Sequence, residues 1–356
     1  MTDLNREVQA VGAANPLLEA VDIRVEFRAG KRALVAVAGV DLAVGDAESV
    51  AIIGESGSGK TTLAMSMMRV HALSRGRVMF DGRDITNLSF RQLNPIRAKM
   101  QMVFQNPYSS LDPRMSVARL IAEPLYAQHY GSRAAVADRV EELLDAVALP
   151  QSSTTRLPSQ FSGGQRQRIA IARALATSPR LLIADEPMSA LDVSVQSQIG
   201  RLMQSLQERL GIAYLLIAHD LTLVYHLADR VYVMYLGRVV ESGSSTEVVY
   251  RPLHPYTAAL LSATPSPTGR RREKRIVLRG EPPSPFDVPI GCPFHPRCPI
   301  ARKPCATETP PLAPTGNGRS VACFYPGELP GISPMSLQKV DVRVQPPGNR
   351  IRELPT

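Results

Sequence analysis

A short glycine-rich run carries the residues best suited to chemistry. It reads Gly54-Glu55-Ser56-Gly57-Ser58-Gly59-Lys60-Thr61-Thr62, and its first eight residues fit the pattern G-x-x-x-x-G-K-[ST]. Glycines allow successive backbone N–H groups to point at a phosphate, and a helix that begins there adds positive potential. We expect the Lys60 ammonium to contact the β- and γ-phosphates and the Thr61 hydroxyl to bind Mg²⁺. The alternative is that the segment is a glycine-rich turn that binds nothing. The residues predicted to form this site are Gly54, Ser56, Gly57, Gly59, Lys60, Thr61 and Thr62.

Two acidic residues end an apolar run further along the chain. The run Leu181–Ala184 is followed at once by Asp185 and Glu186. We expect Asp185 to hold Mg²⁺ and Glu186 to polarise an attacking water, because phosphoryl transfer depends mainly on positioning and charge stabilisation. Two acidic residues after an apolar run are weak evidence for phosphoryl transfer when they occur alone. They are strong evidence when the same chain also contains the phosphate-binding loop.

A second glycine segment begins a predicted helix. Ser162-Gly163-Gly164-Gln165 precedes the apolar-periodic run IAIARAL. Ser162 suits a helix N-cap, and the two glycines would expose backbone N–H groups at a place where helices bind anions. Taken alone, the segment fits an ordinary helix start equally well.

Buried strands and amphipathic helices alternate around these motifs. Ser49–Ile53, Leu181–Ala184 and Tyr214–Ala218 are apolar runs that end in glycine or polar residues, as buried strands do. Helical spacing of apolar residues predicts a helix over Arg133–Leu149, and another is expected from Lys60 onward. The pattern predicts an α/β fold with a largely parallel sheet covered by helices on both faces. Ligands bind such sheets beyond the carboxyl ends of the strands, which is where the polar motifs fall.

Composition narrows the class of protein. The chain has 356 residues, a formal net charge of +9, 5% aromatic residues and no tryptophan. Its length predicts about two domains, and its few aromatic side chains argue against a base-stacking or sugar-binding platform. No apolar run reaches the roughly 18 residues that span a bilayer, and residues 1–17 carry Asp3 and Glu7 without an apolar stretch. We therefore expect a soluble, cytosolic protein whose positive charge suits an anionic partner.

The chain divides near Arg251–Pro255. Of its 30 prolines, 21 lie in residues 251–356, and all four cysteines follow residue 290. We expect an α/β body in residues 1–250, a loop-rich extension in residues 251–330 and a flexible tail in residues 331–356.

The order of the three motifs is the most informative feature. The phosphate-binding loop comes first, Ser162–Gln165 second, and Asp185 20 residues after that segment. This order resembles the nucleotide-binding subunit of ABC transporters, and the middle segment resembles their signature motif, although Phe161 stands where leucine is usual. The resemblance covers about residues 20–245 and implies a P-loop NTPase (ABC ATPase) core with a helical subdomain at about residues 106–178. It also implies ATP and Mg²⁺ as cofactors and ATP hydrolysis as the reaction.

Other positions of the family can be matched one by one. Gln105 resembles the glutamine that contacts metal or water, Asp192 the aspartate at the dimer seam, and His219 the histidine near the γ-phosphate. Phe27 fits the aromatic residue that stacks on adenine, with a core position as the alternative. The residues thus predicted to act in hydrolysis are Glu186, His219 and Gln105. Those predicted to bind Mg²⁺ are Thr61, Gln105 and Asp185. Those that the resemblance adds to the ATP site are Phe27, Ser162, Gly163, Gly164, Gln165 and Asp192.

The resemblance also implies a dimer. In this family the signature segment of one subunit caps the ATP held by another, so Ser162 and Gly164 are expected to act across an interface with a second ATPase subunit, either the same chain or a homologous one. The edge around Tyr108–Met115 is expected to receive helices from membrane subunits.

The extension resembles the C-terminal region of oligopeptide/dipeptide import ATPases. The matching segments are Arg251–Thr257, Gly280–Pro285 and Gly291–Pro299. They imply an importer of di- or oligopeptides, or of a related solute, at the cytoplasmic face of the inner membrane. They further imply two transmembrane permease subunits and an extracytoplasmic solute-binding protein as partners, and no nucleic acid.

The cysteines raise the question of a second cofactor. Cys292, Cys298, Cys305 and Cys323 are separated by five, six and seventeen residues. The absence of a C-x-x-C pair weakens a zinc site, and a cytosolic setting weakens disulfides. Four thiolates suffice for a [4Fe–4S] cluster, which the resemblance also implies. Zinc and metal-free thiols stay open as alternatives, and His295 is read as a turn residue rather than a ligand.

A different function is also compatible with part of the sequence. A soluble ABC-type ATPase acting on the ribosome or on DNA would suit the net charge of +9 and the basic run at residues 270–275, otherwise read as a solvated linker. Such proteins commonly carry two nucleotide domains or a long coiled coil, and we identify neither here. A non-hydrolysing regulatory nucleotide binder is disfavoured because Glu186 and His219 are both present.

Overall fold

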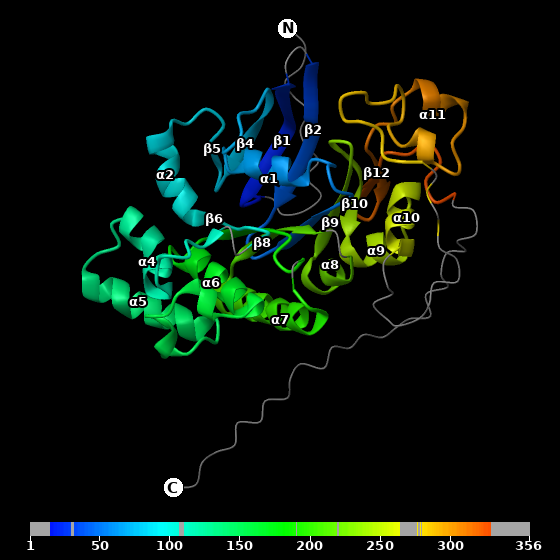
Figure 1. Ribbon diagram of the computed structural model, residues 1–356. Helices are drawn as coiled ribbons and strands as arrows, with labels where there is room; N and C mark the ends of the chain where they lie inside the picture. Colours follow the sequence, from blue (N-terminus) through cyan, green and yellow to red (C-terminus); the bar gives the residue numbers. More distant parts are fainter. Residues whose placement is uncertain are drawn as a thin grey trace.

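The computed structural model describes residues 15–29, 32–106, 110–189, 191–218, 221–263, 276, 278 and 280–328. Their strands form one four-stranded and one eight-stranded sheet (Figure 1). The four-stranded sheet consists of β1 (Leu18–Ala29), β2 (Arg32–Val44), β4 (Arg75–Phe80) and β5 (Arg83–Asp84). The eight-stranded sheet consists of β3 (Ser49–Ile53), β6 (Met100–Val103), β7 (Leu181–Asp185), β8 (Ala213–Ala218), β9 (Arg230–Tyr235), β10 (Arg238–Ser244), β11 (Ala313–Gly316) and β12 (Arg319–Val321).

Helices surround the larger sheet. The α-helices are α1 (Lys60–Met67), α2 (Phe90–Lys99), α4 (Val117–Ala127), α5 (Arg133–Ala146), α6 (Gly163–Leu175), α7 (Val193–Leu210), α8 (Leu221–Leu227), α9 (Ser245–Tyr250), α10 (Pro255–Ala263) and α11 (Lys303–Thr307). The 3₁₀ turns within the described residues are η1 (Gln151–Ser153), η2 (Pro158–Gln160) and η3 (His295–Arg297). In Figure 1 the helices α4–α7 lie on one side of the larger sheet and the four-stranded sheet on the other.

The larger sheet gathers the motifs at one edge. Its order is β11-β12-β10-β9-β3-β8-β7-β6, and the five strands from β9 to β6 run parallel. Ile53 at the end of β3 pairs with Ala218 of β8, and Asp185 at the end of β7 pairs with Ile217. The predicted parallel sheet is therefore confirmed, and the carboxyl ends of its central strands lie next to one another.

Burial on both faces explains why these strands are apolar throughout. Every residue of β3, β7 and β8 is buried. Ala51 and Ile53 of β3 enter one hydrophobic core, whereas Val50 and Ile52 enter the other, as the two-residue period of a strand requires. The predicted runs agree with these strands to within one residue at each end.

The sequence pattern does not predict the antiparallel four-stranded sheet. In β1, Ala20 and Ile23 are both buried, but the pairing with β2 shifts register between them, and Asp22 has a φ of 50°. This irregularity interrupts the strict alternation by which a half-buried strand is recognised.

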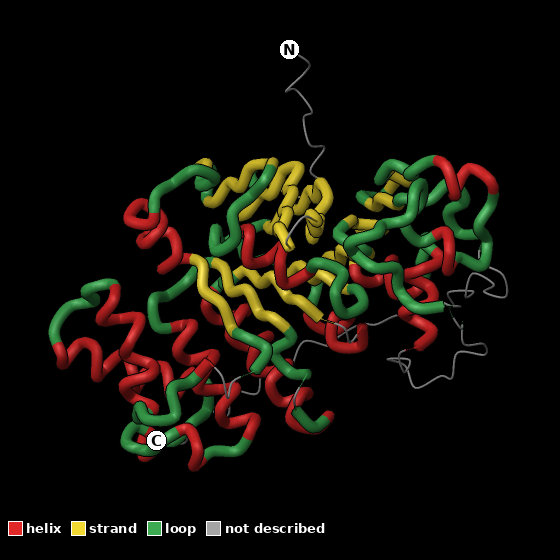
Figure 2. The backbone as a smooth tube through the Cα atoms, turned by 45° about the horizontal axis from the view of Figure 1, so that its top comes forward, coloured by secondary structure: helices red, strands yellow, loops and turns green. Residues whose placement is uncertain are grey.

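The cysteine-containing extension continues the larger sheet. Glu241 of β10 pairs with Val321 of β12 in antiparallel fashion, and β12 pairs in turn with β11. Tyr256 and Phe294 of the extension belong to the same hydrophobic core as Ala51 of β3 and Leu182 of β7. Figure 2 shows the extension, mostly loop, packed beside the body.

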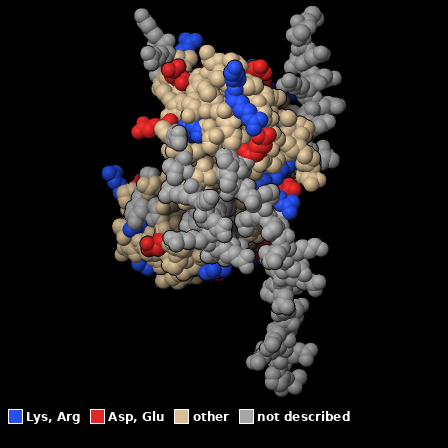
Figure 3. Space-filling view, turned by 90° about the vertical axis from the view of Figure 1, so that its right-hand side faces the viewer, with Lys and Arg blue, Asp and Glu red and all other residues tan. Residues whose placement is uncertain are grey.

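Surface features bear on membrane and nucleic-acid contacts. Within the described ranges, no helix combines the length and apolarity needed to cross a membrane. On the face shown in Figure 3, basic and acidic side chains are interspersed rather than gathered into one basic patch. The basic run at residues 270–275 and the tail at residues 331–356 lie outside the described residues.

Candidate functional site

The glycine-rich loop joins β3 to α1. Gly57 and Gly59 have φ values of 77° and 99°, which glycine adopts without strain. A Cβ on Gly59 would lie 2.3 Å from the carbonyl oxygen of Ala36, so no other residue fits. Ser56 and Gly57 are exposed at the tip of the loop. The loop thus presents backbone N–H groups and the start of a helix to an anion.

The Lys60 side chain lies inside this loop. It is only 6% exposed, and its Nζ donates to the carbonyl oxygens of Gly54 (2.8 Å) and Glu55 (2.9 Å). Burial lowers the pKa of Lys60, while the charges of Glu186, Asp185 and Glu55 oppose that shift. An ammonium with this lowered pKa would gain from a bound phosphate, because an anion favours its charged form.

Thr61 and Asp185 meet at the ends of α1 and β7. The Thr61 hydroxyl donates to both carboxylate oxygens of Asp185, at 3.1 and 3.0 Å. Burial raises the pKa of Asp185, and the Thr61 hydrogen bond opposes that rise. A hydroxyl and a carboxylate are oxygen ligands of the kind that Mg²⁺ prefers, so this pair fits the predicted metal.

Glu186 and Gln105 are brought together although they are far apart in sequence. Gln105 Nε2 donates to Glu186 Oε2 at 2.9 Å. Glu186 has a φ of 44°, and its backbone N–H donates to the carbonyl oxygen of Ile217 at 2.9 Å. The backbone hydrogen bond therefore holds the turn at Glu186 on the neighbouring strand β8, directly after Asp185 in the chain.

The second glycine segment forms the predicted helix start. Ser162 Oγ accepts from the Gln165 N–H (3.3 Å), and Gln165 Oε1 accepts from the Ser162 N–H (3.0 Å), which is a capping box. A Cβ on Gly164 would lie 2.5 Å from Val195 Cγ1, so this glycine permits close packing of α6 on α7. Phe161 is buried beneath the Arg156 guanidinium, 4.3 Å from its ring, which accounts for an aromatic residue here. The capping bonds of Ser162 and Gln165 close this helix start on itself and do not reach the phosphate loop.

The structure describes most of the remaining predicted residues but not all of them. Phe27 is 36% exposed, and its ring meets His71 edge-on at 5.3 Å, so it is available for stacking rather than buried in the core. Asp192 is exposed at the N-cap of α7, and Thr62 is half-buried in α1. His219 lies outside the described residues.

The four cysteines line one pocket of the extension. They are free thiols, and His254 and His295 share the lining with Cys292, Cys298, Cys305 and Cys323. The Cys292 N–H donates to the Cys305 carbonyl oxygen at 2.8 Å. Burial raises the pKa of Cys298 to about 11 and also raises the pKa of Cys292 and of Cys323. Across the described part of the chain, no three His, Cys, Asp or Glu side chains lie close enough to hold one metal ion.

The sequence pattern missed residues of the extension that touch the phosphate loop. Tyr256 Oη accepts from the Glu55 N–H at 2.7 Å, and Arg297 forms an ion pair with the Glu55 carboxylate. Glu55 occupies an unspecified position of the motif, so the pattern itself gave no signal of these contacts. An acidic residue beside a predicted anion site was the signal that could have indicated a cationic partner for Glu55.

Comparison with known proteins agrees with this site. Residues 37–189 match the family model described as ABC transporter, and residues 240–305 match the oligopeptide/dipeptide transporter C-terminal region. The oligopeptide transport ATP-binding protein AppF of Bacillus subtilis is 46% identical over 291 residues, covering 81% of this chain and 88% of AppF.

Solved structures agree as well. The ATP-binding cassette MJ0796, in a dimeric post-hydrolysis state with ADP and Pi, superposes with a TM-score of 0.59 at 29% identity, covering 64% of this chain and 98% of that one. The cbiO1 protein of Clostridium perfringens gives a TM-score of 0.60 at 29% identity, over 65% and 90% of the two chains. The chain belongs to the ATP-binding subunits of ABC transporters, in the group that carries the oligopeptide/dipeptide transporter C-terminal region.

Proposed function

We propose that this chain is the ATP-hydrolysing subunit of an ABC importer for di- or oligopeptides or a related solute. The observation that carries the proposal is the presence, in one chain, of the Lys60–Thr61–Asp185 site and of a C-terminal region shared with oligopeptide and dipeptide transporters. The name and the 46% identity of AppF support peptides as the solute class. They do not favour a soluble ATPase that acts on the ribosome or on DNA.

The described side chains have separable roles in hydrolysis. Lys60 and the loop N–H groups hold the phosphates, and Thr61, Asp185 and Gln105 would hold Mg²⁺. The bound metal would supply positive charge against the charge of the phosphates. Glu186, oriented by its 2.9 Å hydrogen bond from Gln105, accepts a proton from the attacking water. Phe27 stacks on adenine, and the role expected of His219 from the sequence falls on a residue outside the described ranges.

A second ATPase subunit completes the site. The capping box leaves Ser162 exposed at the start of α6, and Asp192 is exposed at the start of α7. In the proposed dimer, Ser162 and Gly164 with their neighbours Gly163 and Gln165 contact the ATP bound to the partner subunit, and Asp192 lies at the seam. A chain that cannot pair would then bind ATP and hydrolyse it poorly.

The proposed complex places this chain at the cytoplasmic face of the inner membrane. Two transmembrane permease subunits would contact it, and an extracytoplasmic solute-binding protein would deliver the solute. Phe104, next to Gln105, is 43% exposed and supports such a contact surface. Tyr108, at the predicted permease edge, lies outside the described residues.

The four cysteines are the proposed ligands of a [4Fe–4S] cluster. Four thiolates suffice for such a cluster, and all four cysteines line one pocket. Among the described residues no three His, Cys, Asp or Glu side chains lie close enough to hold one metal ion, so the shared pocket lining is the observation that supports this proposal. The cluster would serve as a structural cross-link within the extension.

Purification of the tagged chain from gently solubilised membranes, followed by mass spectrometry, tests the function. Two co-purifying permeases and peptide-stimulated ATP hydrolysis would support it, and a second, different ATPase would show a mixed pair. Ribosomal proteins or nucleic acid without a membrane partner would overturn the importer assignment.

A further inference from the structure

The extension reaches the phosphate loop at Glu55. Arg297 of η3 places its two terminal nitrogens 2.9 and 3.2 Å from the Glu55 carboxylate oxygens. Only 8% of the Arg297 side chain and 26% of the Glu55 side chain are exposed. A two-point ion pair of this kind holds both partners in one geometry, and removal of either partner would leave a poorly exposed charge uncompensated.

A second contact fixes the backbone of the same residue. The Glu55 N–H donates to Tyr256 Oη at 2.7 Å, and the Glu55 carbonyl oxygen accepts from Lys60 Nζ at 2.9 Å. Tyr256 and Arg297 thus act on the residue that also binds the lysine of the phosphate site.

The two extension residues rest on a packed aromatic group. The rings of Tyr235, Tyr256 and Phe294 lie 4.7 to 5.4 Å apart, and Arg297 also contacts the Tyr235 hydroxyl. All three aromatic residues are 2% exposed or less. Such packing leaves Tyr256 little freedom to turn away from the loop.

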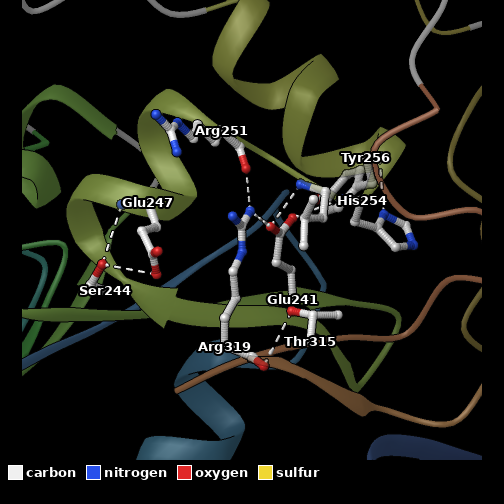
Figure 4. Close-up of polar contacts among 9 residues, drawn as sticks. Glu241, Ser244, Glu247, Arg251, His254, Tyr256, Thr315 and Arg319 are labelled. Atoms are coloured by element: carbon white, nitrogen blue, oxygen red, sulfur yellow. Dashed lines mark hydrogen bonds and ion pairs between the residues drawn. The ribbon is translucent and has the colours of Figure 1, made fainter. Parts of the chain in front are cut away.

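A buried carboxylate anchors the start of α10, close to Tyr256 in sequence (Figure 4). Glu241 is fully buried and accepts from the backbone N–H groups of Leu253 (2.8 Å) and His254 (2.9 Å), while Arg319 of β12 pairs with the same carboxylate. His254 Nδ1 accepts from the Tyr256 N–H at 3.0 Å. Tyr256 is therefore tied to both β10 and β12.

The charge of Glu55 matters for an anionic ligand. The Glu55 carboxylate acts electrostatically on the Lys60 ammonium, and the Glu55 carbonyl oxygen accepts from Lys60 Nζ at 2.9 Å, so Glu55 belongs to the loop that would hold the phosphates. An acidic group there repels a triphosphate unless a cation neutralises it. Arg297 supplies that cation from a segment 242 residues further along the chain.

We propose that the C-terminal extension completes the nucleotide site, with Arg297 and Tyr256 as positioning residues that neutralise and hold Glu55. This proposal rests on the assignment of Gly54–Thr61 as the nucleotide site. It adds that the extension, which carries the cysteine pocket, sets nucleotide affinity through two named contacts. Arg297 stands immediately before Cys298, so a change in that pocket would reach the phosphate loop through η3.

The test compares ATP affinity among variants of the full chain. Arg297→Gln leaves the Glu55 charge unneutralised and should weaken ATP binding about tenfold, the size expected when a charged partner is lost. Glu55→Gln added to Arg297→Gln removes the repelling charge and should restore most of the affinity. Tyr256→Phe keeps the ring but loses the acceptor for the Glu55 N–H, and should weaken binding about threefold to tenfold.

A matched control comes from the same extension. Arg302 pairs with Glu328 at the surface, where both side chains are about half exposed, so Arg302→Gln should leave affinity unchanged. Thermal melting of each variant identifies folding defects, so a loss and a rescue of ATP affinity at an unchanged melting temperature are the readout that a purely structural role of Arg297 would not give.

The outcomes distinguish a failure of the nucleotide-site assignment from a failure of the role given to the extension. If Lys60→Ala weakens ATP binding while Arg297→Gln and Tyr256→Phe bind as the parent does, the site stands and the role of the extension is overturned. If Lys60→Ala binds ATP normally, the site itself is wrong. A double variant that binds as weakly as Arg297→Gln alone would refute neutralisation of Glu55 as the mechanism.

Discussion

Gly164 provides the sharpest test of how the signature segment is built. Its missing Cβ would lie 2.5 Å from Val195 Cγ1 in the first turn of α7. Gly164→Ala should therefore push α6 away from α7. Overpacking of this kind costs about 1–3 kcal/mol. At about 2–4 °C per kcal/mol, the melting temperature should fall by about 2–12 °C.

A second substitution relieves the clash. Val195→Ala removes the Cγ1 atom and leaves the Val195 Cβ at 3.8 Å from the added methyl, an ordinary contact. The double variant should regain most of the lost stability, whereas Val195→Ala alone should cost about 1 kcal/mol for its lost apolar contact. Gly163→Ala is the matched control, because its Cβ meets only the flexible end of Leu191, at 3.2 Å.

The assay combines melting of the chain with ATP hydrolysis by the assembled complex. If Gly164 serves packing alone, the double variant recovers both stability and hydrolysis. If the glycine also contacts the partner's ATP, the double variant melts normally and hydrolyses slowly. Gly164→Ala that melts at the parent's temperature would refute the packing argument.

Four further substitutions test the two cofactor sites. Lys60→Ala should weaken ATP binding by about 1.5–3 kcal/mol, the worth of a charge-assisted contact, as measured by nucleotide titration. Glu186→Gln should keep ATP binding and reduce hydrolysis about 10²- to 10⁴-fold, so a fully active variant would exclude Glu186 as the base. Burial raises the pKa of Asp185, so its contribution to stability is present below the unfolded pKa and is lost as pH rises through the folded pKa. Asp185→Asn should therefore raise the melting temperature of the nucleotide-free chain at neutral pH while reducing hydrolysis; a lower melting temperature there would contradict this. Cys298→Ser should abolish the brown colour and the bound iron and sulfide of anaerobically purified protein, and a colourless parent with stoichiometric zinc would refute the cluster.

The local parts of the fold and site could be predicted from the sequence. A buried parallel strand needs apolar residues on both faces, so Ser49–Ile53 was recognisable as β3. The glycine pattern made the loop predictable, because Gly59 has a positive φ and lies too close to the Ala36 carbonyl oxygen to carry a side chain. Because β3, β8, β7 and β6 are neighbours, the motifs at their carboxyl ends had to converge.

Contacts between distant segments could not be predicted in the same way. The buried Glu241–Arg319 pair joins β10 to β12, and an isolated Glu or Arg is ordinarily a surface residue, so nothing in the sequence indicates this contact. The irregular pairing of β1 also breaks the alternation of buried and exposed residues, so this alternation does not reveal the antiparallel sheet.

The unspecified positions of the phosphate loop carry information that the motif leaves out. The pattern requires glycine, lysine and threonine for reasons of backbone shape and charge, and it accepts any residue at Glu55. An acidic residue there opposes the anion that the loop binds, so it is stable in a functional site only if another segment supplies a cation. Arg297 meets that need from the extension. The same reasoning predicts that the charge at position 55 and the charge at position 297 must be changed together, because either one alone leaves a poorly exposed charge without its partner.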